Sequence, residues 1–212
     1  MRGDWTAVMP VKRLGVAKSR LRGAVPPARH ADLALAMVRD TVTAVLAVCD
    51  LVVVTDDPVI AAAAAGLGAR AVPDLPDAGL NDAMRYGADE VAGLTRFRAV
   101  LAGDLPALRP AELDEALTEA GDARSYVVDA AGTGTVLLAA PPGVPLDPRF
   151  GIGSARAHAE SGARALGGDW PGLRQDVDTP ADLATVLALG AGAHTCALLR
   201  DLGLKVACVS AA

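Results

Sequence analysis

Short apolar runs of β-strand character alternate with helical patterns along almost the whole of this 212-residue sequence. That alternation is typical of β-α-β units, in which a helix connects two parallel strands of one sheet. The pattern predicts strands at Trp5–Val11, Leu51–Thr55, Ala69–Val72, Phe97–Ala102, Ser125–Val128, Thr135–Ala139 and Leu173–Val177, and helices at Ala28–Val48, Ile60–Leu67, Leu80–Leu94, Ala111–Ala120, Ser154–Ala163 and Ala181–Leu189. We therefore expect one α/β domain of three layers over residues 1–190, with a mostly parallel, mixed sheet. Residues 191–212 form an Ala-, Gly- and Leu-rich tail whose structure the sequence does not predict.

The apolar segments are those of a globular core and not of a membrane protein. Hydrophobic residues make up 52% of the chain, but the apolar runs are too short or too broken by glycine to span a bilayer. Residues 1–11 lack the apolar centre of a secretory signal. We therefore expect a cytoplasmic protein with no membrane partner.

Charge is distributed unevenly along the chain. The net charge is −5, yet the first 30 residues carry seven Lys or Arg side chains and a single acid. An acidic protein with one basic segment favours a small polyanionic ligand. Nucleic-acid-binding domains are usually basic throughout and often carry aromatic platforms, whereas aromatic residues are only 3% of this chain. We expect no nucleic-acid partner.

The basic side chains gather directly after the first predicted strand. Lys12, Arg13, Lys18 and Arg20 lie in this loop, where an open α/β sheet would hold a phosphate chain. The loop lacks the glycine frame of a Walker P-loop. Its charge favours the binding of a nucleoside triphosphate, and the alternative is an ordinary solvated basic loop.

Three acidic residues lie at or just beyond the ends of predicted strands. Asp104 comes after Gly103, and Asp176 and Asp178 would point to the same side of an extended segment because they are two residues apart. Carboxylate oxygens are suitable ligands for Mg²⁺, so the three acids form a candidate metal site. The alternative for Asp178 is that it caps the helix that starts near Thr179.

Two glycine-containing segments are candidate anion sites. Gly151 and Gly153 precede Ser154, which is predicted to be a helix N-cap beside backbone N–H groups that could bind an anion. The segment 132–135 ends in Thr135 and offers a hydroxyl and a backbone open to close approach, although such a segment alone is more often a tight hairpin. The three histidines show no partner spacing, so we expect them at surface or helix positions without a catalytic role: His30, His158 and His194.

Five ordered motifs resemble one known family. They are Pro10–Leu14 with Ala17–Leu21, Gly103–Leu108, Gly132–Thr135, Pro148–Gly151 with Ser154–Arg156, and Trp170–Arg174 with Asp176–Leu183. Their order and approximate spacing, over about residues 6–190, resemble the phospho-carboxylate guanylyltransferases of deazaflavin coenzyme (F-420) biosynthesis. The sequence is most similar to the actinobacterial branch, which uses phosphoenolpyruvate, while archaeal relatives are assigned 2-phospho-L-lactate.

The resemblance implies a nucleotidyltransferase of the glycosyltransferase-A type that transfers GMP from GTP to phosphoenolpyruvate. It assigns Mg²⁺ to Asp104 and Asp176, with Asp178 close by, and the GTP phosphates to the loop Lys12–Arg20. Thr135, Gly151 and Ser154 would contact phosphoenolpyruvate. Asp104 and Lys18 would then be the residues most directly involved in catalysis. The activated product would be handed to a downstream transferase.

The chemistry of such a transfer agrees with the residues present. A phosphate monoester loses its second proton near pH 6, so the attacking oxygen is already ionised and needs no general base. Positioning and charge neutralisation then suffice for catalysis. The same motifs leave open transfer to 2-phospho-L-lactate, 3-phosphoglycerate or a sugar phosphate. Two other classes remain as alternatives: a nicotinamide oxidoreductase, which the missing glycine fingerprint opposes, and an inactive nucleotide-binding regulator.

Overall fold

A seven-stranded sheet forms the centre of the computed structural model, which describes residues 4–14, 25–75, 77–204 and 206. The strands are β1 (Trp5–Pro10), β2 (Asp50–Val54), β3 (Arg70–Val72), β4 (Phe97–Leu101), β5 (Ser125–Val128), β6 (Thr135–Ala140) and β7 (Arg164–Ala165). Their order across the sheet is β3-β2-β1-β4-β6-β5-β7. Strands β1 to β4 are parallel to one another, and β6 runs antiparallel to both β4 and β5. The expected mixed, mostly parallel sheet is confirmed.

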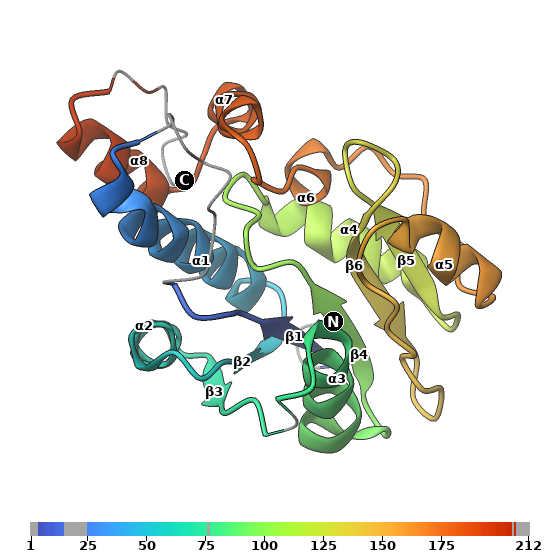
Figure 1. The fold of residues 1–212 in the computed structure, drawn as a ribbon. Coiled ribbons are helices and arrows are strands. Elements are labelled where there is room, and N and C mark those ends of the chain that lie inside the picture. The colour runs from blue at the N-terminus through green and yellow to red at the C-terminus, as the bar shows by residue number, and fades with distance from the viewer. Residues whose placement is uncertain (1–3, 15–24, 76, 205, 207–212) are drawn as a thin grey trace.

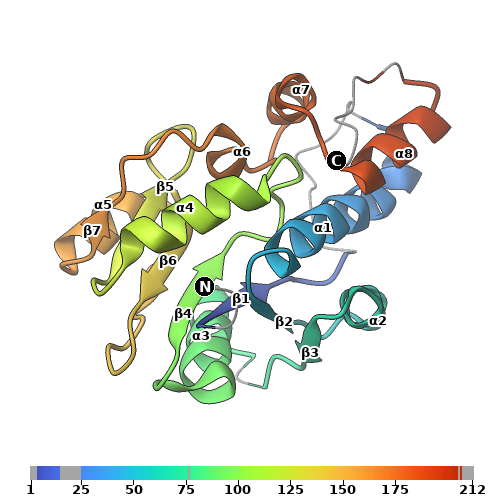
Figure 2. The same cartoon turned by 180° about the vertical axis from the view of Figure 1, so that it is seen from behind.

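Helices cover both faces of the sheet, as Figures 1 and 2 show. The α-helices are α1 (His30–Leu46), α2 (Pro58–Leu67), α3 (Leu80–Arg85), α4 (Pro110–Ala120), α5 (Ser154–Glu160), α6 (Pro171–Arg174), α7 (Pro180–Leu189) and α8 (Ala193–Asp201); a short 3-10 turn η2 (Pro27–Arg29) precedes α1, and a π-helix η3 (Tyr86–Gly93) continues α3. Alternate side chains of the strands enter two separate cores. One core packs against α1, α2 and α4, and the other against α3, η3 and α5. The three-layer arrangement follows from this alternation. No helix in the described part of the chain is both long and apolar enough to cross a membrane.

The last helix, α8, is fastened to α1 by one buried carboxylate. Asp40, in α1, accepts the backbone N–H groups of His194 and Thr195 at 2.9 and 2.8 Å, so it caps the start of α8. A Cβ atom on Gly192 would lie 2.4 Å from the carboxyl carbon of Asp40, so only glycine fits at this position. Burial raises the pKa of Asp40, and the hydrogen bonds from Thr195 and His194 oppose that rise. Cys196 and Leu199 of α8 enter a third core together with side chains of α1 and α7.

The predicted strand Leu173–Val177 is wrong. Residues Pro171–Arg174 form the short helix α6 instead, and residues 175–177 are irregular. The cause is distant in sequence: the buried carboxylate of Glu112 accepts the N–H groups of Gly172 and Leu173 at 3.1 and 2.8 Å and so stabilises the helix start. The short strand β7, at the edge of the sheet next to β5, was not predicted.

Candidate active site

The C-terminal ends of the parallel strands and the start of β6 lie at one edge of the sheet. Because β1, β2 and β4 run in the same direction, their last residues share this edge. Strand β6 continues the edge: the N–H of Ala102, just after β4, donates to the carbonyl of Val136 at 2.9 Å. The antiparallel register therefore brings Thr135 next to the turn that carries Asp104. Ligands of open α/β sheets bind beyond such an edge.

Two cavities, each of about 380 Å³, flank the end of β1 and share the side chain of Lys12. The first cavity extends toward β2 and α3 and is also lined by Arg13. The second cavity lies between β1, α1 and the turn after β4, and it contains Asp104 and Asp178. Lys12 thus lines both cavities. Of the predicted nucleotide-binding residues, Lys12 and Arg13 are brought together here, whereas Lys18 and Arg20 lie outside the described residues.

Acidic side chains that were not predicted from the sequence also line the first cavity. They are Asp56, Asp74 and Asp77. The Oδ1 atom of Asp74 is buried and has no hydrogen-bond partner in the described part of the structure. Burial raises the pKa of this carboxyl group. A buried carboxylate oxygen in need of a donor is a recognition point for a ligand that carries N–H groups.

The basic loop begins at a fixed position against α2. The N–H of Leu14 donates to Asp57 at 2.9 Å, and the other carboxylate oxygen of Asp57 accepts the N–H of Val59 at the start of α2. The hydrogen bond from Leu14 is the main cause that lowers the pKa of Asp57. A helix cap therefore also anchors the segment that presents Lys12 and Arg13.

The turn that carries Asp104 is held by α1. Thr41, which is fully buried in that helix, accepts the N–H of Leu105 at 3.0 Å and donates its hydroxyl to the carbonyl of Met37 at 2.9 Å. On the other side of the turn, the N–H of Gly192 donates to the carbonyl of Pro106 at 2.7 Å. The half-buried Asp104 thus projects from a turn that is fixed at both ends.

The second acidic segment is fixed by α6 and α7. The helix cap of α7 is Thr179, whose side chain and that of Asp182 form a reciprocal capping box, so Asp178 is not the cap. Val177 is fully buried in the third core, while Asp178 is exposed and lines the second cavity. Asp176 is half-buried and lies outside both cavities described above.

A divalent cation fits part of the predicted acidic site. No group of three or more Asp, Glu, His or Cys residues within the described residues is arranged to hold a metal ion, so the three acids do not form a cluster of three. Asp104 and Asp178 nevertheless share one cavity. Mg²⁺ commonly takes one or two protein carboxylates and completes its shell with substrate phosphates and water. The two carboxylates present therefore fit a magnesium ion that is bound together with a nucleotide.

The candidate acceptor residues differ in detail from their predicted roles. The N-cap of α5 is Gly153, at φ 72°, and Ser154 is the first helical residue. The prediction that Ser154 is the N-cap is therefore wrong. The N–H of Ser154 donates to the carbonyl of Gly151 at 3.1 Å. The next N–H, of Ala155, donates to the carbonyl of Thr133 at 3.1 Å, which ties α5 to the turn before β6. That turn is a hairpin between β5 and β6, and it brings the buried Thr135 close to the start of α5.

A buried histidine stands behind these residues. His158 lies in α5, one of the settings expected for it, but its ring is fully buried and is bonded at both nitrogens. Nδ1 is 2.9 Å from the hydroxyl of Thr135, and Nε2 accepts the N–H of Arg149 at 2.9 Å. Burial is the main cause that lowers the pKa of His158 to about 4, and Arg124 contributes. The one sequence signal for this role is its position one helical turn after Ser154, on the same face of the helix.

The sheet and the placement of the site define a nucleotidyltransferase fold of the nucleotide-diphospho-sugar transferase type. A putative nucleotide-diphospho-sugar transferase from Desulfovibrio desulfuricans G20 is similar in structure, with a TM-score of 0.71 at 19% identity over 96% of each chain. The CMP:2-keto-3-deoxy-manno-octonic acid synthetase complexed with CTP is also similar, with a TM-score of 0.56 at 17% identity over 88% of this chain and 98% of that one. These two likenesses establish the fold.

Sequence comparison places the chain in a particular family. Residues 5–212 match the family described as guanylyl transferase CofC like, and the chain belongs to it. The phosphoenolpyruvate guanylyltransferase of Salinispora arenicola is 62% identical over 92% of each chain. That of Geodermatophilus obscurus is 54% identical over 92% of this chain and 94% of its own length. The protein is therefore an enzyme, a guanylyltransferase within the nucleotidyltransferases.

Proposed function

We propose that this protein transfers GMP from GTP to the phosphate group of phosphoenolpyruvate and releases pyrophosphate. The observation that carries the proposal is the pair of cavities that share Lys12 at the edge of the sheet. One ammonium group between the two cavities can contact the phosphates of a nucleotide that spans them. The names of the relatives at 62% and 54% identity support phosphoenolpyruvate as the acceptor.

The first cavity is suited to the nucleoside of GTP. Lys12 and Arg13 supply positive charge on its phosphate side. In the same cavity, Asp74 offers the buried oxygen that has no donor among the described residues. Guanine presents N–H donors on one edge, and a carboxylate is an acceptor for them, whereas adenine presents a ring acceptor at the matching position. This arrangement favours GTP over ATP.

The second cavity is suited to the reacting phosphates. Asp104 and Asp178 would hold Mg²⁺ there, and a bound Mg²⁺ would supply charge neutralisation for the triphosphate. Lys12 adds a cation on the nucleotide side. Thr135, at the start of β6, would orient the acceptor beside the same edge, and Gly151 and Ser154 would contribute contacts from the adjoining segment. Asp176 and the loop residues Lys18 and Arg20 keep the roles that the resemblance assigns to them.

The reaction balances without a general base. An ionised oxygen of the acceptor phosphate attacks the α-phosphorus of GTP, the bond from that phosphorus to the bridging oxygen breaks, and pyrophosphate leaves with the electron pair. The product is enolpyruvoyl-2-diphospho-5'-guanosine. Because the nucleophile is already a dianion near neutral pH, the protein has to position two anions and neutralise their charge.

A comparison of acceptors tests the proposal. The protein is incubated with GTP and Mg²⁺ and, in separate reactions, with phosphoenolpyruvate, 2-phospho-L-lactate, 3-phosphoglycerate or glucose 1-phosphate, and pyrophosphate release is measured. We expect the highest kcat/KM with phosphoenolpyruvate, and a strong loss when ATP replaces GTP. A higher kcat/KM with another acceptor would replace the proposed substrate. Release that is independent of any acceptor would show a hydrolase instead.

The resemblance also assigns a place in metabolism to this reaction. We propose that the enzyme acts in the biosynthesis of the deazaflavin coenzyme F-420 and hands its product to a downstream transferase. The product is a mixed diphosphate that is activated for transfer of the phosphoenolpyruvyl group. Loss of the coenzyme from cells that lack this gene, with restoration by the intact gene, would support the assignment, and unchanged coenzyme levels would reject it.

A further inference from the structure

The imidazole of His158 is held between one backbone donor and one hydroxyl. The N–H of Arg149 points at Nε2 from 2.9 Å, and the Oγ1 atom of Thr135 lies 2.9 Å from Nδ1. The ring is fully buried, and Phe150 packs edge-on against it with 5.1 Å between ring centres. Neither ring nitrogen therefore exchanges its partner with water.

These two partners determine the tautomer of the ring. A backbone N–H can only donate, so Nε2 must accept and cannot carry a hydrogen. A neutral imidazole then carries its hydrogen on Nδ1, which donates to Thr135. The hydroxyl oxygen of Thr135 thus accepts a hydrogen bond from Nδ1 of His158, and its own hydrogen remains available for a different acceptor.

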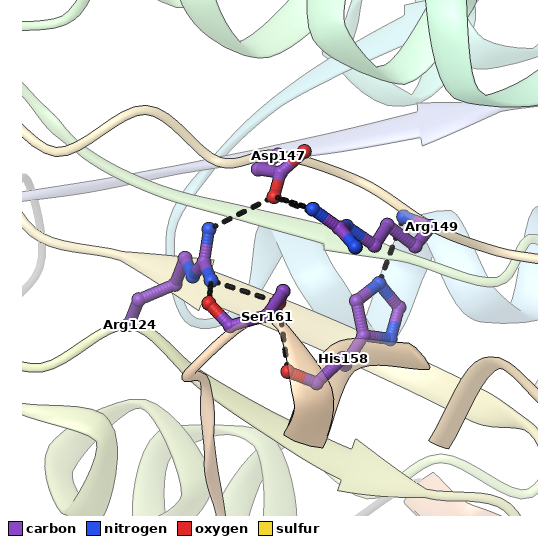
Figure 3. Close-up of polar contacts among 5 residues, drawn as sticks. All are labelled: Arg124, Asp147, Arg149, His158 and Ser161. Carbon is purple, nitrogen blue, oxygen red and sulfur yellow. Dashed lines mark hydrogen bonds and ion pairs between the residues drawn. The ribbon is translucent and has the colours of Figure 1, made fainter. Parts of the chain in front are cut away.

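A closed cycle of charged and polar contacts includes His158 (Figure 3). Asp147 accepts from Arg149 at 3.0 Å and pairs with Arg124 at 3.4 Å. Arg124 donates to the hydroxyl of Ser161 at 2.8 Å and also to its carbonyl oxygen. The hydroxyl of Ser161 donates to the carbonyl of His158 at 2.7 Å, and this hydrogen bond completes the cycle of contacts at the end of α5. The loop that carries Arg149 is therefore fastened to α5 at two points.

Burial and the charges of these neighbouring side chains keep the imidazole neutral. Arg124 and Arg149 both oppose a positive charge on His158, and Asp147, which favours one, is already paired with both arginines. The low pKa of about 4 that results from burial and from these cations agrees with the neutral ring that the hydrogen bonds require. A protonated ring would also place an N–H on Nε2 directly against the N–H of Arg149.

We propose that His158 is a positioning residue that fixes the hydroxyl of Thr135 as a hydrogen-bond donor toward the anionic acceptor substrate. The proposal rests on the proposed function, in which Thr135 contacts that acceptor. A phosphate or carboxylate offers only acceptor oxygens, so a threonine whose hydrogen was spent on His158 would repel it. Through His158, the fold selects for an anion at this point of the site.

Two substitutions test the two hydrogen bonds of the imidazole separately. In His158→Asn the side-chain amide can replace Nδ1 and still donate to Thr135, but it cannot reach Arg149. In His158→Gln the side-chain oxygen can replace Nε2 and still accept from Arg149, but no donor remains for Thr135. Binding of phosphoenolpyruvate and of GTP is measured for each by calorimetry. We expect His158→Gln to weaken phosphoenolpyruvate about tenfold, as for one hydrogen bond to a charged group, and to leave GTP unchanged.

A control variant and a double variant test whether His158 affects phosphoenolpyruvate binding through Thr135. His194→Gln makes the same change at a histidine whose described hydrogen bond is made by its backbone, and we expect no effect on binding. The substitution Thr135→Val removes the hydroxyl, and adding His158→Gln to it should weaken phosphoenolpyruvate no further. Fully additive losses, or an unchanged affinity in His158→Gln, would overturn the proposal.

The tautomer itself is read without any substrate. A long-range ¹H–¹⁵N correlation spectrum of the wild-type protein with labelled histidine distinguishes a hydrogen on Nδ1 from one on Nε2. We expect the Nδ1–H form of His158 at pH 7, and an Nε2–H form or a charged ring would overturn the proposal even if the variants fail to fold. If the wild-type protein uses another acceptor, the proposed substrate is wrong, and the same binding comparison is made with that acceptor.

Discussion

The hydroxyl of Thr41, in the middle of α1, accepts the backbone N–H of Leu105 at 3.0 Å, directly beside Asp104. Both partners are fully buried, so this hydrogen bond has no water to replace it. The position of the candidate metal ligand therefore depends on a helix that is some 60 residues earlier in the chain.

Substitution of Thr41 by valine tests this support. Thr41→Val keeps the shape of the side chain but leaves the buried N–H of Leu105 without an acceptor, which costs about 1–3 kcal/mol in the free energy of unfolding. Activity should fall as well, because the turn that carries Asp104 loses its anchor. Chemical denaturation and steady-state kinetics measure the two effects. The matched control is Thr43→Val, since Thr43 is exposed in the same helix and donates to the carbonyl of Arg39. Equal stabilities of the two variants would contradict the account.

Removal of the charge of Asp104 tests the metal site. Asp104→Asn should lower kcat on the order of 100-fold or more, because the charge of the leaving pyrophosphate would be poorly compensated. The protein should stay folded, since Asp104 is only half-buried and lies on a turn. Asp114→Asn, at an exposed position of α4, is the control and should be fully active. A Mg²⁺ titration should show that Asp104→Asn alone needs a higher Mg²⁺ concentration for half-maximal activity. An unchanged Mg²⁺ dependence there would remove Asp104 from the metal site.

Lys12 is predicted to contact the phosphates of GTP because it lines both cavities. Lys12→Met should lower kcat/KM for GTP. The expected loss of transition-state stabilisation is roughly 2–3 kcal/mol, the range for a charge-assisted hydrogen bond to phosphate in a site shielded from water. The control is Arg70→Met, which removes a cation from an exposed position in β3. Kinetics at saturating acceptor isolate the effect on GTP. If the two variants behave alike, net charge and not the position of Lys12 would explain the loss.

The buried His158 predicts a pH dependence of stability. Its ordinary pKa is 6.5 and the folded value is about 4, so between these values the unfolded chain binds more protons than the folded one. Stability is therefore present in full above about pH 6.5 and falls as the pH is lowered toward 4, by on the order of 3 kcal/mol in total. Urea unfolding from pH 7.5 to 4 measures this, and the difference between wild type and His158→Asn isolates the histidine from the acidic groups. A difference that does not change with pH would contradict the buried, neutral ring.

The strands and most helices could be predicted because their signals are local. The run Leu51–Val54 is apolar on both faces, and Asp57 and Pro58 mark the next helix start, so sequence spacing alone is sufficient. Where the structure depends on distant contacts, the prediction failed. Helix α6 forms because Glu112 stabilises its start from another helix, and nothing within residues 171–177 carries that information.

The site was predictable to a similar extent. Asp104 and Lys12 could be found because each follows the end of a strand, where ligands of this fold bind. Asp178 was also found, although the strand predicted before it does not form. The donor and acceptor pattern around His158 could not, because it arises from Arg149 in a loop and Thr135 in a strand, which only the folded chain brings together. The buried oxygen of Asp74 is likewise a property of packing and not of sequence spacing.

The central claim is the attack of the acceptor phosphate on the α-phosphorus of GTP, and isotope transfer tests it most directly. Phosphoenolpyruvate with ¹⁸O in its phosphate group is incubated with GTP, Mg²⁺ and the protein, and the masses of the products are measured by mass spectrometry. The account predicts that all the ¹⁸O stays in the guanylylated product, including its new bridging oxygen, and that the released pyrophosphate is unlabelled. Label in the pyrophosphate, or GMP formed without a labelled adduct, would contradict it.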